Sequence, residues 1–244
     1  MTDIIYLDTV GSTNDYLRNV PTPAQGDMVV AVARYQTAGR GQGSNTWESE
    51  PGKNLLFSVL TSPQTVDIRR QFVLSMAGAL ALKAALDTRC GDITLKWPND
   101  IYWRNRKISG TLIETAVAGH TITRCIYGIG LNVNQRQFTS DAPNPVSLAN
   151  ITGHETPTDE LLHDILHHFG RYCSMATGGD EAAVEAQYNA ALYRREGMHS
   201  YADTATGQVF EAQIERVSAD GRLHLLTAGG QRRAFWLKEV RFVL

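Results

Sequence analysis

The chain has 244 residues, 43% of them hydrophobic and 20% charged, which suits one large domain with a small appendage and excludes wholesale disorder. Its formal net charge of -2 provides no global basic field that would favour nucleic acid or an anionic membrane surface. The three cysteines show no CxxC spacing and no apolar run has membrane-spanning length, so we expect a cytoplasmic protein without a disulfide framework or membrane partner.

The first quarter of the chain predicts three strands and a short helix. Residues 3–7 predict a short strand, and a helix at 12–17 follows with a hydroxyl side chain as its N-cap. The apolar runs at 29–35 and 54–61 predict buried strands. Between them, residues 37–46 predict a loop, because they are rich in glycine and small polar residues.

The middle of the chain predicts one long helix and then four strands. Residues 68–87 form the clearest helix, since apolar side chains recur there at helical spacing. The segments at 93–96, 101–103, 111–116 and 121–130 alternate or run apolar between turns, which is typical of strands. This order predicts an α+β fold.

Polar and helical segments follow the strands of the middle. Residues 135–145 are polar and contain prolines, so we expect a mobile loop there. Helical patterns then cover 159–175 and 181–193.

The sequence changes in character near residue 197. Three short strands are predicted at 209–217, 223–227 and 235–240, and glycine-bearing turns lie between them. These strands predict a small β-barrel that is too short for much independent stability. We therefore expect two domains, residues 1–195 and 196–244.

A glycine loop follows the second predicted strand, with Gly39, Gly41 and Gly43 alternating with Arg40 and Gln42. Alternating glycines let the backbone approach a ligand closely, and their free N–H groups can form an anion-binding concavity. Arg40 adds donors suited to carboxylate or phosphate. The spacing matches neither a Rossmann fingerprint nor a P-loop, and a flexible surface hairpin explains this segment equally well on its own.

A second motif is Lys96-Trp97-Pro98-Asn99-Asp100, in which a predicted strand delivers a lysine into a proline turn. Lysine can neutralise phosphate charge, and aspartate can hold a magnesium ion that bridges phosphates. A well-made turn with a solvated lysine remains the simpler explanation of this segment alone.

Lys107 lies shortly after this turn and can reach a reacting centre between an acid and an α-phosphate. The alternative is a surface lysine beside Arg104 and Arg106. Further along, glycines at 128 and 130 end a long strand, and Asn132 after them can pair with a purine edge. The alternative there is a bulge at a strand end.

Two other groups of polar residues carry alternatives. Ser12, Thr13 and Asn14 offer hydroxyl and amide groups that can bind a neutral polar head group, although simple N-capping explains them as well. His163 and His167 have the spacing of a helical zinc site with aspartate in place of glutamate. They fall outside the apolar stripe of their helix and no third ligand follows, which favours a solvated face over zinc.

Taken together and in this order, these motifs resemble those of the biotin–protein ligases. The resemblance spans about residues 5–150 and continues weakly through 221–223 and 235–240. It is specific because six separate segments match in the family's order. The matching residues are Ser12, Thr13, Asn14, Gln36, Gly39, Arg40, Gly41, Trp47, Lys96, Trp97, Pro98, Asn99, Asp100, Lys107, Gly110, Gly128, Gly130, Leu131 and Asn132.

The resemblance implies a mixed β-sheet flanked by helices, similar to class II synthetases, as the catalytic domain at residues 1–195. A C-terminal SH3-like barrel would follow at 196–244. It also implies that ATP and biotin are substrates, that Mg²⁺ assists, and that biotin passes through biotinyl-AMP to a lysine of a biotin carboxyl carrier protein, as in acetyl-CoA carboxylase.

The resemblance assigns roles residue by residue. Lys107 and Arg40 would be the catalytic cations, and Asp100 would bind the metal ion. Biotin would be held by Ser12, Thr13, Asn14, Gln36, Gly39, Arg40, Gly41, Gln42 and Lys107. The nucleotide would be held by Trp47, Lys96, Asn99, Asp100 and Asn132.

Two departures from the family pattern carry expectations of their own. Many members have arginine where this chain has Gln42, and the lost positive charge bears on how firmly the adenylate is retained. The bifunctional members carry a helix-turn-helix domain before the first motif, whereas Ser12 stands almost at the start here, so we expect no DNA partner. Alternatives to this function are a lipoate–protein ligase or octanoyltransferase, and a binding module that consumes no ATP.

Overall fold

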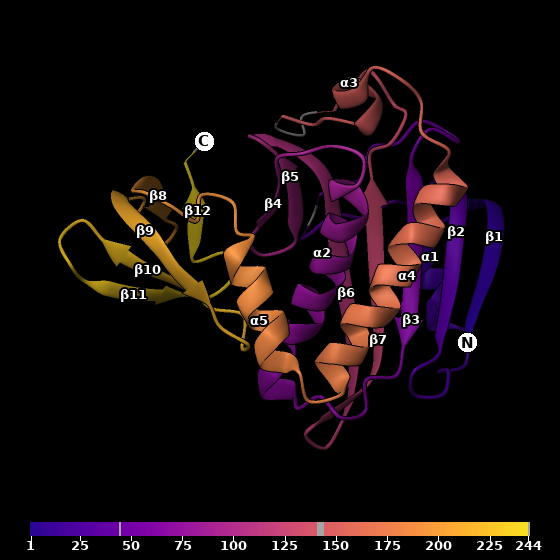
Figure 1. The fold of residues 1–244 in the computed structure, drawn as a ribbon, viewed down its shortest axis with the longest axis horizontal. Helices are drawn as coiled ribbons and strands as arrows, with labels where there is room; N and C mark the ends of the chain where they lie inside the picture. The colour runs from indigo at the N-terminus through magenta and orange to yellow at the C-terminus, as the bar shows by residue number, and fades with distance from the viewer. Residues whose placement is uncertain (44, 141–143, 244) are drawn as a thin grey trace.

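A computed structural model describes residues 1–43, 45–140 and 144–243, and within them the chain forms a seven-stranded sheet and a five-stranded sheet (Figure 1). Position 44 of the predicted loop at 37–46 and positions 141–143 of the loop at 135–145 lie outside the described residues. The helical elements are α1 (Thr13–Arg18), η1 (Ile68–Arg70), α2 (Phe72–Asp87), α3 (Leu148–Thr152), α4 (Thr158–Thr177) and α5 (Glu181–Ala190).

The large sheet contains the first seven strands in the order β1-β2-β3-β7-β6-β5-β4. Its strands are β1 (Thr2–Val10), β2 (Met28–Gln36), β3 (Leu55–Thr61), β4 (Ile93–Lys96), β5 (Asp100–Trp103), β6 (Arg106–Ala118) and β7 (Thr121–Leu131). The β1–β2 pair is parallel and every other neighbouring pair is antiparallel, so the predicted mixed sheet is confirmed.

The two faces of the large sheet pack against different helices, because side chains alternate between faces along each strand. Phe57 and Tyr127 face the main apolar core under α2 and α4, which Figure 1 shows in front of the sheet. Leu60 and Ile126 face the other way and pack with Leu17 of α1. Helix α1 is only six residues long, so most of this second face has no helix over it.

Two helical predictions need correction at their boundaries, and one helix was missed. The helix predicted at 68–87 begins as α-helix only at Phe72, because Asp67 accepts a hydrogen bond from the Arg69 N–H and forms the separate turn η1. The helix predicted at 181–193 ends at Ala190. Helix α3 was not predicted; Ser147 starts it with a capping box.

The C-terminal part forms a five-stranded antiparallel sheet in the order β11-β10-β9-β8-β12 within the described residues. Its strands are β8 (His199–Asp203), β9 (Val209–Val217), β10 (Leu223–Thr227), β11 (Arg232–Phe235) and β12 (Val240–Phe242). The predicted C-terminal β-structure is confirmed as this small sheet, but the pairings among the described residues do not close it into the predicted barrel. The prediction of a single strand at 235–240 was wrong, because a turn separates β11 from β12. Strand β8 was not predicted.

The small sheet packs against the helices of the large one. The Trp97 Nε1–H group donates to the Gly221 carbonyl at 2.9 Å, and Asn189 of α5 donates to the Val217 carbonyl at 2.9 Å. One apolar cluster joins the two parts of the chain and includes Leu74 of α2 and Leu223 of β10. The domain boundary between residues 195 and 196 stays a prediction. Among the described residues, none of the helices has the length and apolarity to span a membrane.

Candidate active site

A cleft of about 720 Å³ lies on the α1 face of the large sheet, over β7, β6 and β5. Every residue predicted for the site lines this cleft except Gly39, whose carbonyl instead accepts a hydrogen bond from the Trp47 N–H at 3.1 Å. The predicted residues in its wall are Ser12, Thr13, Asn14, Gln36, Arg40, Gly41, Gln42, Trp47, Lys96, Asn99, Asp100, Lys107 and Asn132.

Small residues on neighbouring strands make room for the cleft. Gly128 of β7 pairs with Ser58 of β3, and Gly130 pairs with Gly110 of β6. A Cβ added at Gly128 would stand 2.3 Å from Asn14 Oδ1, and one at Gly130 would stand 2.3 Å from the Trp47 ring. Real Cβ contacts are not that short, so both positions require glycine if Asn14 and Trp47 are to lie against the sheet.

One end of the cleft is a connected set of neutral polar side chains, which we call the amide cluster: Thr13, Asn14, Gln36 and Ser58. Gln36 Oε1 accepts from the Thr13 N–H at 2.7 Å and lies 3.1 Å from the Thr13 hydroxyl. The Thr13 and Ser58 hydroxyls are 2.6 Å apart, and Ser58 donates to Asn14 Oδ1 at 2.6 Å. Thr13, Asn14 and Ser58 are buried, so the cluster is a rigid wall rather than a solvated helix start.

The amide cluster continues into a set of charged side chains, of which Arg40 lines the cleft. Asn14 Nδ2 donates to Glu114 of β6 at 3.1 Å, and Glu114 pairs with Arg18 at 2.7 Å. Asp15 accepts two hydrogen bonds from Arg40, at 2.7 and 3.0 Å. The hydrogen bond from Arg40 holds the pKa of Asp15 below its usual value, and the same bond raises the pKa of Arg40.

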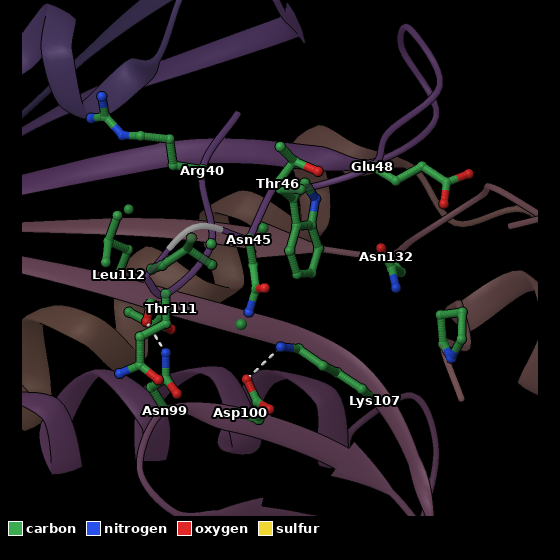
Figure 2. A pocket seen from close by; sticks show the side chains of 18 of the residues that line it. Arg40, Asn45, Thr46, Glu48, Asn99, Asp100, Lys107, Thr111, Leu112 and Asn132 are labelled. Carbon is green, nitrogen blue, oxygen red and sulfur yellow. Dashed lines mark hydrogen bonds and ion pairs between the residues drawn. The ribbon is translucent and has the colours of Figure 1, made fainter. Parts of the chain in front are cut away.

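The other end of the cleft holds what we call the lysine cluster: Lys96, Asp100 and Lys107. Lys107 Nζ forms an ion pair with Asp100 Oδ1 at 2.6 Å, drawn as a dashed line in Figure 2. Lys96 Nζ lies 5.0 Å from the ring centroids of both Tyr102 and Phe242. Burial lowers the pKa of Lys96, and the nearby Asp100 carboxylate opposes that shift.

The structure separates the two side chains predicted to be catalytic cations. Arg40 extends away from Lys107 toward its ion pair with Asp15, as Figure 2 shows for Arg40 and Lys107. The Lys107 Nζ instead lies 5.7 Å from the centroid of the Trp47 ring. The guanidinium of Arg40 thus faces Asp15, away from the ammonium group of Lys107.

Two buried polar atoms beside the cleft have no hydrogen-bond partner among the described residues: Trp47 Nε1 and Asn132 Oδ1. The amide nitrogen of Asn132 is occupied, since it donates to the Val146 carbonyl at 3.2 Å. Buried polar groups are rarely left unpaired in folded proteins. The wall of the cleft thus contains one donor and one acceptor that no described residue pairs.

The sequence model of the biotin/lipoate A/B protein ligase family matches residues 6–132, which include most of the cleft. The chain belongs to this family. Its fold agrees: the chain superposes with a TM-score of 0.81 and 24% identity on the Aquifex aeolicus biotin protein ligase solved with biotin and ATP, covering 99% of both chains.

Curated relatives in the family include both short and bifunctional proteins. The Bacillus subtilis bifunctional ligase/repressor BirA is 30% identical over 183 residues, covering 72% of this chain and 55% of that protein. The Paracoccus denitrificans biotin–[acetyl-CoA-carboxylase] ligase is 32% identical over 148 residues, covering 58% of this chain and 61% of that protein. The chain thus spans between half and two thirds of the length of these relatives.

Three polar residues of this ligase-family site were not predicted from the sequence. Ser58 joins Thr13 to Asn14, and Glu114 anchors Asn14 from β6. Glu48 accepts from the N–H groups of Thr139 and Ser140 at 2.9 Å each. Burial raises the pKa of Glu48, but these hydrogen bonds outweigh it and the pKa lies below its usual value. A serine inside an otherwise apolar strand was the one local signal available.

Some of the predicted residues hold the walls of the site in place. Asn99 Nδ2 donates to the Thr111 carbonyl at 2.6 Å, so its amide fixes the turn between β4 and β5 against β6. Gln42 and Gly41 line the cleft beside Arg40. No group of three or more His, Cys, Asp or Glu side chains that could hold a metal occurs among the described residues, and Asp100 is the carboxylate within the lysine cluster.

Proposed function

We propose that the chain is an ATP-dependent ligase that forms biotinyl-AMP from biotin and ATP and transfers biotin to a lysine of a biotin carboxyl carrier protein. The observation that carries this proposal is a single cleft with the neutral amide cluster at one end and the lysine cluster at the other. The first suits an uncharged polar head group such as biotin's ureido ring, and the second suits phosphates. The name of the Paracoccus denitrificans relative supports the biotin half, and the Aquifex aeolicus structure solved with biotin and ATP supports both halves.

The proposed reaction has two steps. In the first, a carboxylate oxygen of biotin attacks the α-phosphorus of ATP, the bond from that phosphorus to the bridging oxygen breaks, and pyrophosphate leaves. In the second, the amine of the carrier lysine attacks the acyl carbon, the acyl–oxygen bond breaks, AMP leaves, and the amine releases a proton to solvent. Both steps gather negative charge near the α-phosphate, which fixed cations stabilise.

The roles of the cations follow from their positions. We assign Lys107 to the carboxylate and the α-phosphate, because its ammonium group stands between Asp100 and the Trp47 ring. Arg40 joins it when the ligand replaces Asp15 as its anionic partner. Lys96 serves the outer phosphates, and Asn132 accepts from the base through its unpaired Oδ1.

Asp100 gives this site a carboxylate that can hold the magnesium ion that accompanies ATP. Mg²⁺ keeps several waters and binds through one or two carboxylates and the substrate's phosphates rather than through an all-protein cage. Asp100 is the carboxylate placed to hold it, in exchange for the ion pair with Lys107. The ion would neutralise part of the triphosphate charge.

We infer that the acceptor is the carrier domain of a carboxylase, as the name of the Paracoccus denitrificans relative indicates for that protein. We also infer a cytoplasmic location. Cys90, Cys125 and Cys173 are free thiols, which suits a reducing compartment.

Isotope exchange tests the first step. Biotin should stimulate exchange of labelled pyrophosphate into ATP, whereas lipoate and octanoate should not. Exchange that depends on lipoate instead would move the chain to the lipoate branch of its family. Binding of biotin without any exchange would identify a binding module.

Transfer tests the second step. Labelled biotin should appear on an isolated carboxylase carrier domain only when ATP is present, and a carrier whose target lysine is replaced by arginine should stay unlabelled. Biotin-dependent exchange without labelled carrier would restrict the proposal to adenylation.

A further inference from the structure

We propose that Lys238 of the small sheet is a phosphate-binding residue of this cleft and supplies the positive charge that the glycine loop lacks at Gln42. Lys238 lies in the turn between β11 and β12, far from the glycine loop in sequence. The inference rests on the proposed function for the identity of the ligand, a nucleotide, but not for the position of the charge.

The turn brings the Lys238 ammonium group against the glycine loop. Its Nζ lies 3.8 Å from the position that a Cβ on Gly43 would occupy. Gly43 directly follows Gln42, whose side chain lines the cleft. Among the described residues Lys238 forms no ion pair, whereas Arg40 and Lys107 each have a carboxylate partner. Lys238 is therefore a cation beside the loop whose charge is still available to a ligand.

The backbone of this turn holds Lys238 in a conformation that a lysine does not prefer. Its φ is +70°, in the left-handed region where glycine or asparagine is favoured. Contacts on both sides fix the turn: the Thr204 hydroxyl donates to the Lys238 carbonyl at 2.5 Å, and Glu239 Oε2 accepts from the Trp236 N–H at 2.7 Å. Lys238 is not among the residues that line the cleft itself, and the strained turn holds its side chain beside Gly43, next to the part of the glycine loop that does line it.

The charges of the cleft favour an additional cation. Its lining contains the basic residues Arg40, Lys96 and Lys107 and the acidic residues Glu48 and Asp100, which leaves one positive charge in excess. A nucleoside triphosphate carries several negative charges, and the acyl-adenylate keeps one negative charge on its phosphate until transfer. Gln42 can donate hydrogen bonds but cannot balance these charges. A lysine acts as a flexible point charge on phosphate and can supply that balance from outside the loop.

The first test measures binding of Mg-ATP by titration calorimetry in the absence of biotin. Lys238→Gln should weaken the affinity by about tenfold, the loss expected for a hydrogen bond to a charged group. The matched control is Arg232→Gln, which removes one positive charge from the same sheet at a side chain paired with Glu215. Equal affinities for the two variants would overturn the proposal. Because this readout needs no ligase activity, it separates failure of this proposal from failure of the proposed function.

Two further variants distinguish charge from structure. Gln42→Arg in the Lys238→Gln background should restore the affinity, because it places a positive charge on the same loop; no recovery would contradict the assignment. Lys238→Gly relieves the positive φ, so its melting temperature should equal or exceed that of the wild type while its Mg-ATP affinity falls as in Lys238→Gln. A variant that lost affinity only together with melting temperature would show a structural role instead.

Discussion

The amide cluster and the lysine cluster stand at opposite ends of one cleft and are built differently. In the amide cluster, buried neutral groups satisfy one another, with Ser58 linking Thr13 to Asn14. Beside the lysine cluster, Lys107 is held by Asp100, and the buried Trp47 Nε1 and Asn132 Oδ1 have no partner among the described residues. The polar groups of one end are paired with one another, while the other end has polar atoms that no described residue pairs.

The difference follows from the charge of what each end binds. A neutral head group can be matched by permanent hydrogen bonds at little cost, so the wall can be rigid. A polyanion needs several cations, and burying cations without partners is unfavourable. The half-buried Lys107 is therefore kept on Asp100, the exposed Arg40 is paired with Asp15, and we expect both cations to exchange these carboxylates for phosphate.

The largest expected effect comes from removing the central cation. Lys107→Met should slow biotin-dependent pyrophosphate exchange by roughly 10²- to 10³-fold, because a charge-stabilising donor at the reacting phosphate is lost. It should also lower stability, since Asp100 is left half-buried without its partner. The double variant Lys107→Met/Asp100→Asn should recover the stability but not the rate. An exchange rate within a few fold of wild type would remove Lys107 from the mechanism.

The site residues were predicted from the order of their motifs, which resembles that of the biotin–protein ligases. Taken alone, the glycine loop, the proline turn at 96–100 and Lys107 each had an equally simple explanation as a loop, a turn or a surface residue. Ser58 and Glu114 were not predictable in this way. Their contacts with Asn14 depend on which strands pair, and a strand's own pattern does not specify its neighbours.

Directions of side chains and contacts between the two sheets were also beyond local patterns. Arg40 and Lys107 were predicted as the two catalytic cations, but the direction of the Arg40 side chain depends on Asp15 and Glu114, two carboxylates on other elements. Phe242 packs on Lys96 from the small sheet, where a single strand had been predicted at 235–240. The turn that interrupts this strand has its lysine at positive φ, which a sequence pattern does not indicate.

The second prediction tests whether the amide cluster is rigid. In Gly128→Ala the new Cβ would stand 2.3 Å from Asn14 Oδ1, so Asn14 must move and the Ser58 hydrogen bond must break. We expect a loss of about 3 kcal/mol in the free energy of unfolding and a weaker biotin affinity with little change for Mg-ATP. Gly91→Ala is the matched control, since an added Cβ there meets nothing within 4 Å. Denaturant unfolding and calorimetry measure both quantities, and unchanged biotin affinity would show that the cluster tolerates rearrangement.

The third prediction concerns the hydroxyl that joins the cluster. Ser58→Ala removes the donor to Asn14 Oδ1 and the neighbour of the Thr13 hydroxyl without adding volume. Leaving these buried groups unpaired should lower the free energy of unfolding by roughly 1 to 2 kcal/mol. Biotin affinity should fall as well, because Thr13 and Asn14 lose their fixed orientation. Thr94→Val, on β4, is a control with a hydroxyl that has no partner to lose among the described residues.

The smallest effect on the free energy of unfolding is expected at Lys96, where substitution should raise stability rather than lower it. Burial lowers its pKa below the ordinary 10.5, so the folded state binds a proton less readily than the unfolded chain. The wild type should therefore gain stability as pH rises from the folded pKa toward the unfolded one. Lys96→Met removes this dependence while its thioether keeps the contacts with Tyr102 and Phe242.

At neutral pH, Lys96→Met should accordingly be as stable as the wild type or slightly more stable, and it should bind Mg-ATP more weakly. The difference in unfolding free energy between the two proteins should shrink as the pH approaches 10.5. Denaturant unfolding across this range, with Mg-ATP titration at neutral pH, measures both. A variant that is less stable at neutral pH would mean that the contacts of the Lys96 ammonium with the two rings outweigh its desolvation. The phosphate end would then resemble the amide cluster in being complete before the ligand arrives.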